Sequence, residues 1–309
     1  MGLVRGLAAL AKKHSPSAVS IGNFDGVHLG HQQVVNTLLS QAKTLGIDTT
    51  VVTFEPFARE FFKPNSIARL SSLEERAERL LELGVTQVLT LEFNEELANL
   101  SPQQFIKGVL IDGLNTQFLS VGDDFRFGHQ REGDFQTLVA AGHKANFIVQ
   151  RHKTFEIDGK RVSSGRIRTA LLNDQLDEAH QLLGRAYSIG GTIAVGQKLG
   201  RTLSFPTANI NLGDRYVPVR GVYAVRVEVP GEEGLINGVA NVGYRPTVDG
   251  SEQRLEVHLF DFDRSIYGQH LNVLFKHKIR DEQKFASLDL LKAQIAADAR
   301  EAKRLLEIK

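Results

Sequence analysis

Apolar runs typical of buried strands alternate with helix-type spacing over the first 121 residues. The strand-like runs cover residues 18–21, 48–54, 85–93 and 117–121. Helical spacing of apolar residues begins at residue 31 and recurs over residues 69–84 and 101–113. The alternation predicts an α/β domain with a parallel sheet, helices on both faces, and ligands bound at the carboxyl ends of the strands.

The pattern changes after Gly184, which ends a short helical segment. Strand-type runs separated by Gly, Pro and Asn then cover residues 188–195, 222–229, 235–242, 254–260 and 271–275. Five or six such strands predict a small antiparallel β-barrel. Residues 287–306 carry one apolar helical face, which predicts a terminal helix packed on the barrel. We therefore expect two domains, 1–184 and 185–309.

Composition adds few constraints. The chain has 309 residues, 42% hydrophobic and 24% charged, with a formal net charge of +1, which is typical of a soluble globular protein and gives no reason to expect a nucleic-acid partner. No apolar run approaches the ~20 residues of a membrane span. There is no cysteine, so disulfides and thiolate sites are excluded, and we expect a cytoplasmic protein without a membrane partner.

The first chemical centre lies between the strand at 18–21 and the helix that follows. The connection is rich in glycine and carries His28 and His31. A glycine-rich turn before a helix presents backbone N–H groups and the positive end of the helix dipole to an anion, and imidazoles beside a phosphate suggest transfer chemistry. Two alternatives stay open: a zinc pair, although no third ligand is evident nearby, or ordinary polar histidines at a helix start.

The segment Asn-Phe-Asp-Gly-Val-His-Leu-Gly-His at residues 23–31 resembles the His-x-Gly-His signature of nucleotidyltransferases. The version is that of the prokaryotic bifunctional riboflavin kinase/FMN adenylyltransferases, or FAD synthetases, whose motifs recur here in order from about residue 20 to 260. The resemblance implies a Rossmann-like nucleotidyltransferase domain with His28 and His31 as catalytic residues. It also implies nucleotide or flavin binding by Gly22, Asn23, Phe24, Asp25 and Gly30.

A second polar segment follows the strand at 117–121. Residues 122–128 are rich in glycine yet carry two phenylalanines, and Asp134 is suited to cap the next helix. From local pattern alone this is a surface loop. The segment resembles the family's nucleotide- and flavin-contacting loop, which implies binding roles for Asp124 and Phe125.

Hydroxyl side chains precede two arginines at the start of the helix that ends near Leu172. Hydroxyls at a helix start are most often plain caps, but Ser-Ser-Gly-Arg-Ile-Arg at 163–168 resembles the family's Ser-Ser-Thr-x-Ile-Arg motif, which holds ATP phosphates. The resemblance implies binding by Ser164 and Arg166 and a catalytic Arg168. Gly165 replaces the usual Thr, and losing a hydroxyl–phosphate hydrogen bond costs about 1.5–3 kcal/mol, which weakens adenylyl transfer without abolishing it.

The second chemical centre lies in the predicted barrel. Proline interrupts residues 200–209, which predicts a loop in place of a regular strand. Phe-Pro-Thr-Ala-Asn at 205–209 resembles the most diagnostic riboflavin kinase motif, with Ser204 in place of Gly. The resemblance implies that Thr207 and Asn209 hold Mg²⁺ together with ATP phosphates, which suits a cation that takes few neutral oxygen ligands. It also implies binding roles for Gly200, Arg201 and Arg245.

Phosphorylation of an alcohol requires removal of its proton, so a carboxylate is expected near the γ-phosphate. Glu256 matches the family's catalytic base. Alternation along its strand places Glu256, His258 and Phe260 on one face and the apolar residues between them on the other. The pattern alone favours an outward-facing surface residue without a role over a catalytic base.

The resemblance therefore implies two ATP-dependent reactions. The barrel phosphorylates riboflavin to FMN and ADP, and the N-terminal domain joins FMN to AMP, giving FAD and pyrophosphate. Flavins are then substrate and product, and Mg²⁺ accompanies ATP. We expect a monomer or weak homo-oligomer, which neither the pattern nor the motifs specify.

Two rival functions remain. One is an adenylyltransferase acting on another phosphorylated substrate, such as a pantetheine or nicotinamide mononucleotide. The other is a flavin-binding regulatory protein whose N-terminal site has decayed at Gly165, and which would bind FMN and ATP without releasing pyrophosphate.

Overall fold

The computed structural model describes residues 2–6, 8–9, 15–194, 206–213, 215–247 and 250–307, without the side chains of 245–247 and 250–252. Packing divides the chain into two compact units. The first comprises Met1–Ile67 and Leu73–Ser164, and the second Ala68–Ser72 and Gly165–Lys309. The predicted boundary at residue 184 stays a prediction, since the helices just before it group with the second unit.

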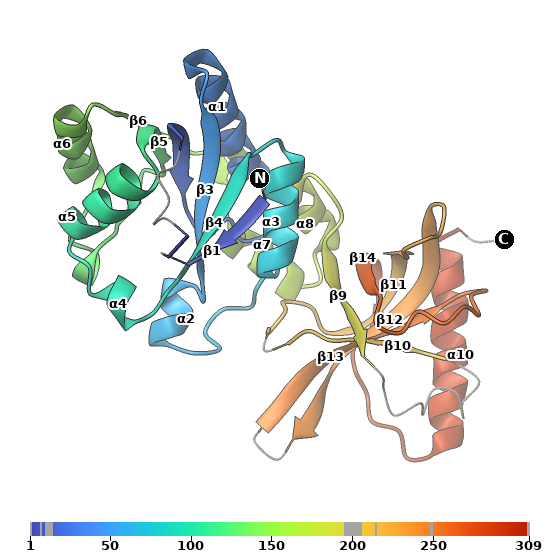
Figure 1. Cartoon of the computed structure of the whole chain (residues 1–309). Helices are drawn as coiled ribbons and strands as arrows, with labels where there is room; N and C mark the ends of the chain where they lie inside the picture. The colour runs from blue at the N-terminus through green and yellow to red at the C-terminus, as the bar shows by residue number, and fades with distance from the viewer. Residues whose placement is uncertain are drawn as a thin grey trace. The chain divides into compact units, whose positions relative to one another are not determined.

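The first unit is built on a six-stranded sheet in the order β1-β4-β3-β2-β5-β6, and every neighbouring pair is parallel (Figure 1). Its strands are β1 (Gly2–Arg5), β2 (Ser17–Ile21), β3 (Asp48–Glu55), β4 (Gln87–Glu92), β5 (Thr116–Val121) and β6 (Ile148–Arg151). Its helices are α1 (Leu29–Leu45), α2 (Ala58–Phe62), α3 (Leu73–Glu82), α4 (Glu95–Ala98), α5 (Pro102–Phe105), η2 (Ile106–Gly113), η3 (His129–Arg131) and α6 (Phe135–Ala145).

Both faces of this sheet are buried. Neighbouring residues of β2 belong to different apolar clusters: Ala18 packs with α1 and α3, whereas Val19 packs with η2 and α6. The same alternation holds for Val88 and Leu89 of β4, as the pleat of a strand requires. The predicted parallel sheet with helices on both faces is confirmed.

Helix prediction over residues 101–113 is confirmed, although the helical period changes within the segment. Ser101 and Gln104 form a reciprocal capping box, with the Ser101 Oγ accepting from the Gln104 N–H at 3.2 Å and the Gln104 Oε1 accepting from the Ser101 N–H at 2.8 Å. After Phe105 the α-helix continues as the π-helix η2. The apolar residues of both parts pack into one cluster. Their spacing in the sequence is compatible with either helical period, so the pattern alone does not reveal the change.

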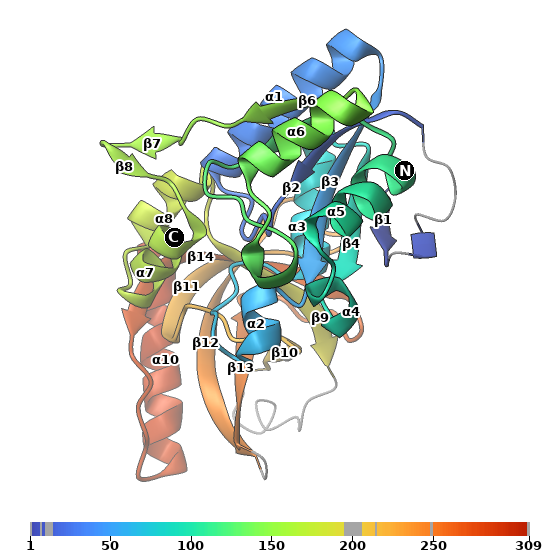
Figure 2. The same cartoon turned by 90° about the vertical axis from the view of Figure 1, so that its left-hand side faces the viewer.

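The sequence pattern did not predict the two edge strands of this sheet or a small hairpin that follows it. Strand β1 is only four residues long, and β6 is largely exposed, so neither shows the continuous apolar run of a central strand. The two-residue strands β7 (Glu156–Ile157) and β8 (Lys160–Arg161) form a small antiparallel hairpin (Figure 2).

The second unit is a closed antiparallel barrel of six strands in the order β10-β13-β12-β11-β14-β9. Its strands are β9 (Ser188–Ala194), β10 (Ala208–Ile210), β11 (Gly221–Glu228), β12 (Leu235–Thr247), β13 (Gly250–Leu259) and β14 (His270–Arg280). The unit also contains α8 (Leu176–Leu183), α10 (Leu288–Leu305) and all of α7 (Ser164–Leu172) except Ser164. The predicted small antiparallel barrel is confirmed.

The terminal helix packs on the outside of the barrel, as predicted. Ser287 caps α10 by accepting from the Leu290 N–H. Ala302 of α10 and Leu306, the residue at its C-terminal end, pack against Val222 on β11 and Val239 on β12. Figure 1 shows α10, in red, lying along these strands, so the outer face of the barrel is partly closed by a helix.

Candidate active sites

The connection between β2 and α1 is a strained turn at the carboxyl end of a central strand. Phe24, Gly26 and Val27 have positive φ angles of 49°, 79° and 41°. This region is unfavourable for the β-branched Val27. Packing sustains it, because Phe24 and Val27 are 3% and 1% exposed and belong to the apolar cluster under α1. Strain held by a rigid surrounding is typical of functional turns.

The two histidines lie together at the start of α1. His28 is the N-cap residue, and its Nδ1 accepts from the His31 N–H at 3.3 Å. The imidazole rings stack with their centroids 3.6 Å apart and 15° between their planes. Because Nδ1 accepts a hydrogen bond, the neutral ring of His28 carries its proton on Nε2. The site thus presents an Nε2–H donor beside the positive end of a helix.

His31 is uncharged near neutral pH. Burial, followed by the neighbouring His28, His152 and Arg161, holds the pKa of His31 well below 6.5. Its Nδ1 is buried and has no hydrogen-bond partner among the described residues. A buried polar atom that lacks such a partner, in a turn suited to bind an anion, is suited to contact a ligand atom.

Two glycines of this turn lie close to aromatic rings. A Cβ at Gly30 would lie 3.2 Å from Cε1 and Nδ1 of His28, and a Cβ at Gly22 would lie 3.2 Å from the Phe24 ring. Both contacts are tighter than ordinary van der Waals distances. A side chain at Gly30 would press on the His28 ring that stacks on His31, and one at Gly22 would press on the Phe24 ring.

Ser164 joins the same turn, since its Oγ donates to the backbone carbonyl of the buried Asp25 at 2.9 Å. The two predicted arginines belong to the second unit, where the Nε of Arg166 pairs with Glu178 at 2.8 Å and the Nε of Arg168 donates to the Ala68 carbonyl at 2.6 Å. The turn residues and Ser164 are therefore brought together within one unit.

The loop after β5 combines structural and candidate binding residues. Asp134 caps α6 through the Thr137 N–H at 2.9 Å, and these hydrogen bonds to Thr137 lower the pKa of Asp134. Asp124 is exposed and pairs with Arg161 at 3.2 Å, while Phe125 stacks on Phe127 with centroids 5.6 Å apart. The local interpretation of a loop ending in a cap is correct, and the binding roles of Asp124 and Phe125 stay predictions.

His152 was not identified from the sequence. Its Nδ1 lies 2.9 Å from the Oγ of the buried Ser120, whose carbonyl accepts from Ser20 on β2. Burial lowers the pKa of His152 to about 4, against the opposing charge of Asp123. A single histidine in a polar segment gives no local signal, so only tertiary structure reveals this contact.

A depressed histidine pKa makes stability depend on pH. Below pH 6.5 the unfolded chain protonates His152 while the folded protein does not, until the pH reaches about 4. The free energy of unfolding therefore decreases as the pH is lowered from 6.5 to 4, by up to about 3 kcal/mol from this group. We expect His152→Asn, which keeps a polar group that can hydrogen-bond to Ser120, to show a shallower loss of stability between pH 6.5 and 4 in urea unfolding. An unchanged slope would contradict the assignment.

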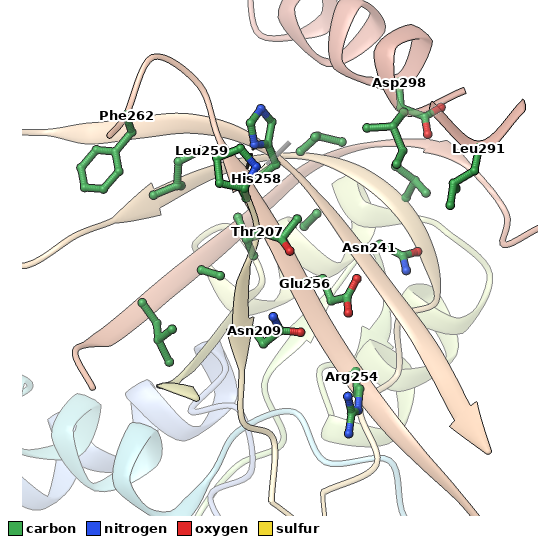
Figure 3. Close-up of a pocket in the computed structure, with 18 of the residues that line it drawn as sticks. Thr207, Asn209, Asn241, Arg254, Glu256, His258, Leu259, Phe262, Leu291 and Asp298 are labelled. Atoms are coloured by element: carbon green, nitrogen blue, oxygen red, sulfur yellow. Dashed lines mark hydrogen bonds between the residues drawn. The ribbon is translucent and has the colours of Figure 1, made fainter. Parts of the chain in front are cut away.

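The second candidate site is a cavity of about 630 Å³ on the outside of the barrel (Figure 3). It is lined by β10, β12 and β13, by the segment 262–267, and by the start of α10. This volume lies within the range of small-molecule sites.

Three polar side chains form a row in this cavity. Glu256 on β13 is in register with Asn209 on β10 and with Asn241 on β12. Cross-strand partners on one face have Cβ atoms about 5 Å apart, and Figure 3 shows the Glu256 carboxylate between the two amides. The predicted alternation is confirmed, because Leu255 and Val257 are fully buried in the barrel.

The predicted loop at 200–209 is wrong for its last residues. Ala208 and Asn209 belong to β10, which pairs with both β9 and β13 and closes the barrel. The proline at 206 misled the pattern because it lies just before the strand, where its missing N–H is tolerated. Thr207 precedes β10 and lines the cavity with Asn209.

Three predicted residues cannot be placed in this cavity. Gly200 and Arg201 lie outside the described residues, as does the side chain of Arg245, whose backbone belongs to β12. Asn241 and Arg254 line the cavity but were not among the predicted site residues. Arg254 lies two residues before Glu256 on β13, so strand alternation could have found it, whereas no alternation was assigned around Asn241 on β12.

The donor atoms suit a metal that arrives with phosphate. Thr207 and Asn209 offer a hydroxyl and an amide oxygen, which are neutral ligands of the kind that Mg²⁺ accepts when phosphates supply the charge. Within the described parts of the chain, no three His, Asp or Glu side chains are grouped closely enough to hold a metal by themselves. A zinc site at His28 and His31 therefore finds no third such ligand there.

Comparison with known proteins defines the class of both units. Residues 10–166 match the FAD synthetase family and residues 183–306 match the riboflavin kinase family. The chain belongs to the bifunctional riboflavin kinase/FMN adenylyltransferases, as its motifs indicated. It is a two-domain enzyme of flavin cofactor synthesis.

Relatives of this name match the chain along its full length. The Pseudomonas fluorescens protein is 47% identical over 99% of this chain and 98% of its own length, and that of Haemophilus influenzae is 46% identical over 98% of each. The crystal structure of a macrolide-efflux protein from Streptococcus pneumoniae is 30% identical, with a TM-score of 0.80 over 98% of this chain and 99% of that chain. Among the described residues, no helix is long and apolar enough to cross a membrane.

Proposed function

We propose that the barrel cavity phosphorylates riboflavin with ATP and that Glu256 is the general base. The observation that carries this proposal is the in-register row of Asn209, Glu256 and Asn241 in one cavity. A carboxylate beside the incoming ribityl hydroxyl removes its proton as the oxygen attacks the γ-phosphorus of ATP, and ADP leaves. Thr207 and Asn209 hold the phosphate end of ATP through their side-chain oxygens.

The same two residues would hold Mg²⁺ bound to ATP. When bound, the ion neutralises charge on the transferred phosphate. The barrel residues contribute alignment: Asn209 lies directly opposite Glu256, so the phosphate and the base are brought to neighbouring strands. Fixed geometry of this kind supplies a large part of phosphoryl-transfer catalysis.

We further propose that the turn at His28 and His31 transfers AMP from ATP to FMN. The nucleophile is a phosphate oxygen of FMN, already anionic at neutral pH, so no protein base is needed. It attacks the α-phosphorus of ATP and pyrophosphate leaves. The His28 Nε2–H, the start of α1 and Arg168 stabilise the charge on the phosphates, while Ser164 and Arg166 bind them.

The remaining binding residues complete the proposal. Flavin or nucleotide contacts are assigned to Gly22, Asn23, Phe24, Asp25, Gly30, Asp124, Phe125, Gly200, Arg201 and Arg245. We also propose that the enzyme works in the cytoplasm as a monomer or weak homo-oligomer, with no nucleic-acid or membrane partner. The lack of cysteine in the chain suits a reducing compartment.

A product assay tests both activities at once. The purified chain is incubated with riboflavin, ATP and Mg²⁺, and riboflavin, FMN and FAD are separated by chromatography over time. We expect FMN first and FAD after it, with ADP and pyrophosphate formed in step. FMN that accumulates without FAD, even when FMN and ATP are supplied directly, would support the decayed-site alternative for the first unit.

Restoring the missing hydroxyl at residue 165 is expected to strengthen adenylyl transfer. Gly165 lies in the first turn of α7, next to Ser164. A hydrogen bond from a Thr hydroxyl to a charged phosphate contributes about 1.5–3 kcal/mol, so Gly165→Thr should raise kcat/KM for FAD formation by roughly tenfold or more. Gly165→Val, which has the same shape without the hydroxyl, is the control. Equal gains in both variants would show that the substitution acts by stabilising the helix and not through a hydrogen bond to the phosphate.

A further inference from the structure

His258 lies in the kinase cavity, two residues beyond Glu256 on the same face of β13 (Figure 3). Its Nδ1 is 2.9 Å from the backbone carbonyl of Pro206. A carbonyl only accepts hydrogen bonds, so Nδ1 carries the proton and donates. The Phe260 ring meets the imidazole edge to face, with centroids 5.8 Å apart, and supports this orientation.

The carbonyl of Pro206 lies just beyond the strand ladder. Register between β10 and β13 ends with Ala208 opposite Val257. Pro206 has no N–H with which to extend the ladder. The His258 side chain therefore holds the chain where the backbone cannot, one residue before Thr207.

We propose that His258 is a positioning residue of the riboflavin kinase site, which fixes the Pro206 carbonyl so that the Thr207 hydroxyl stays beside Asn209. The inference rests on the proposed role of Thr207 in holding the phosphates of Mg·ATP. Loss of the contact frees Thr207 at the end of its strand. Misplacement of a positioning group by about 1 Å is enough to weaken binding of the group it holds.

Two polar replacements distinguish positioning from a general need for histidine. In His258→Asn, the amide nitrogen takes nearly the place of Nδ1 and can still donate to Pro206. In His258→Gln, the amide nitrogen takes nearly the place of Nε2, which does not contact Pro206. His270→Leu is the control, because His270 is an exposed residue of β14 outside the cavity lining.

The experiment measures riboflavin kinase kinetics of the full chain against Mg·ATP and riboflavin, with FAD formation from supplied FMN as a second activity. We expect His258→Gln to raise KM for Mg·ATP by about tenfold, the worth of one hydrogen bond. KM for riboflavin and FAD formation should change little. His258→Asn should stay within about threefold of the wild type, and His270→Leu should match it.

Several outcomes would overturn the inference. An unchanged KM for Mg·ATP in His258→Gln, or equal losses in the Asn and Gln variants, would show that the Pro206 contact does not position Thr207. A fall in kcat alone would assign His258 to the chemical step instead. A wild type without kinase activity would refute the proposed function of the cavity, which is a separate result. Unfolding temperatures of both variants show whether either loss is one of folding.

Discussion

Replacement of His28 by alanine is expected to lower FAD formation from FMN and ATP by roughly a hundredfold to a thousandfold, with riboflavin phosphorylation unchanged. Removal of one preorganised donor to a developing charge has this order of effect. The Nε2–H of His28 is such a donor, because Nδ1 is committed to the His31 N–H. Both activities are measured on the same preparation by chromatography of the flavins.

The alanine variant also loses the cap of α1, which costs about 1 kcal/mol of stability. His28→Asn separates the two effects. Asparagine is a favoured cap residue that accepts from the helix start, but its amide cannot replace the stacked imidazole. We expect His28→Asn to restore the unfolding temperature and not the activity. Recovery of adenylyl transfer in this variant would assign His28 to the helix cap alone.

Replacement of Glu256 by glutamine is expected to lower kcat for riboflavin phosphorylation by about 10²–10⁴-fold, the usual contribution of a general base. The substitution preserves the size of the side chain and its place between Asn209 and Asn241. It removes only the proton acceptor. FAD formation from supplied FMN should be unchanged, because its nucleophile is already anionic.

A matched control tests whether any strand carboxylate gives the same result. Glu228 is an exposed residue on β11 that accepts from Asn272 and lies outside the cavity lining. We expect Glu228→Gln to retain the wild-type kinase rate. A full kinase rate in Glu256→Gln would show that Glu256 is a surface residue without a catalytic role and that another group acts as the base.

Part of the architecture was predictable because the local pattern carries the information. Central strands of a parallel sheet are buried on both faces and read as continuous apolar runs, so β2, β3, β4 and β5 were found. The edge strands β1 and β6 were missed since they are short or exposed. Likewise, alternation along β13 predicted which residues face outward, and the buried Leu255 and Val257 confirm it.

The candidate sites were predictable only in their residue types. Histidines in a glycine-rich turn gave the anion site, but the stacking of His28 on His31 and the buried Nδ1 follow from packing. His152 is recognisable only where β5 and the segment after β6 meet. A contact between residues more than 30 positions apart leaves no trace in local periodicity.

The sequence by itself determined the two domains' fold classes, the family, and the residue types at both centres, because periodicity and short motifs are local properties. Tertiary structure alone decided that Asn209 lies on a strand, that Glu256 stands between two amides, and that His258 holds the Pro206 carbonyl. Register between strands distant in sequence sets these neighbours. It depends on how the whole barrel closes, which no single segment encodes.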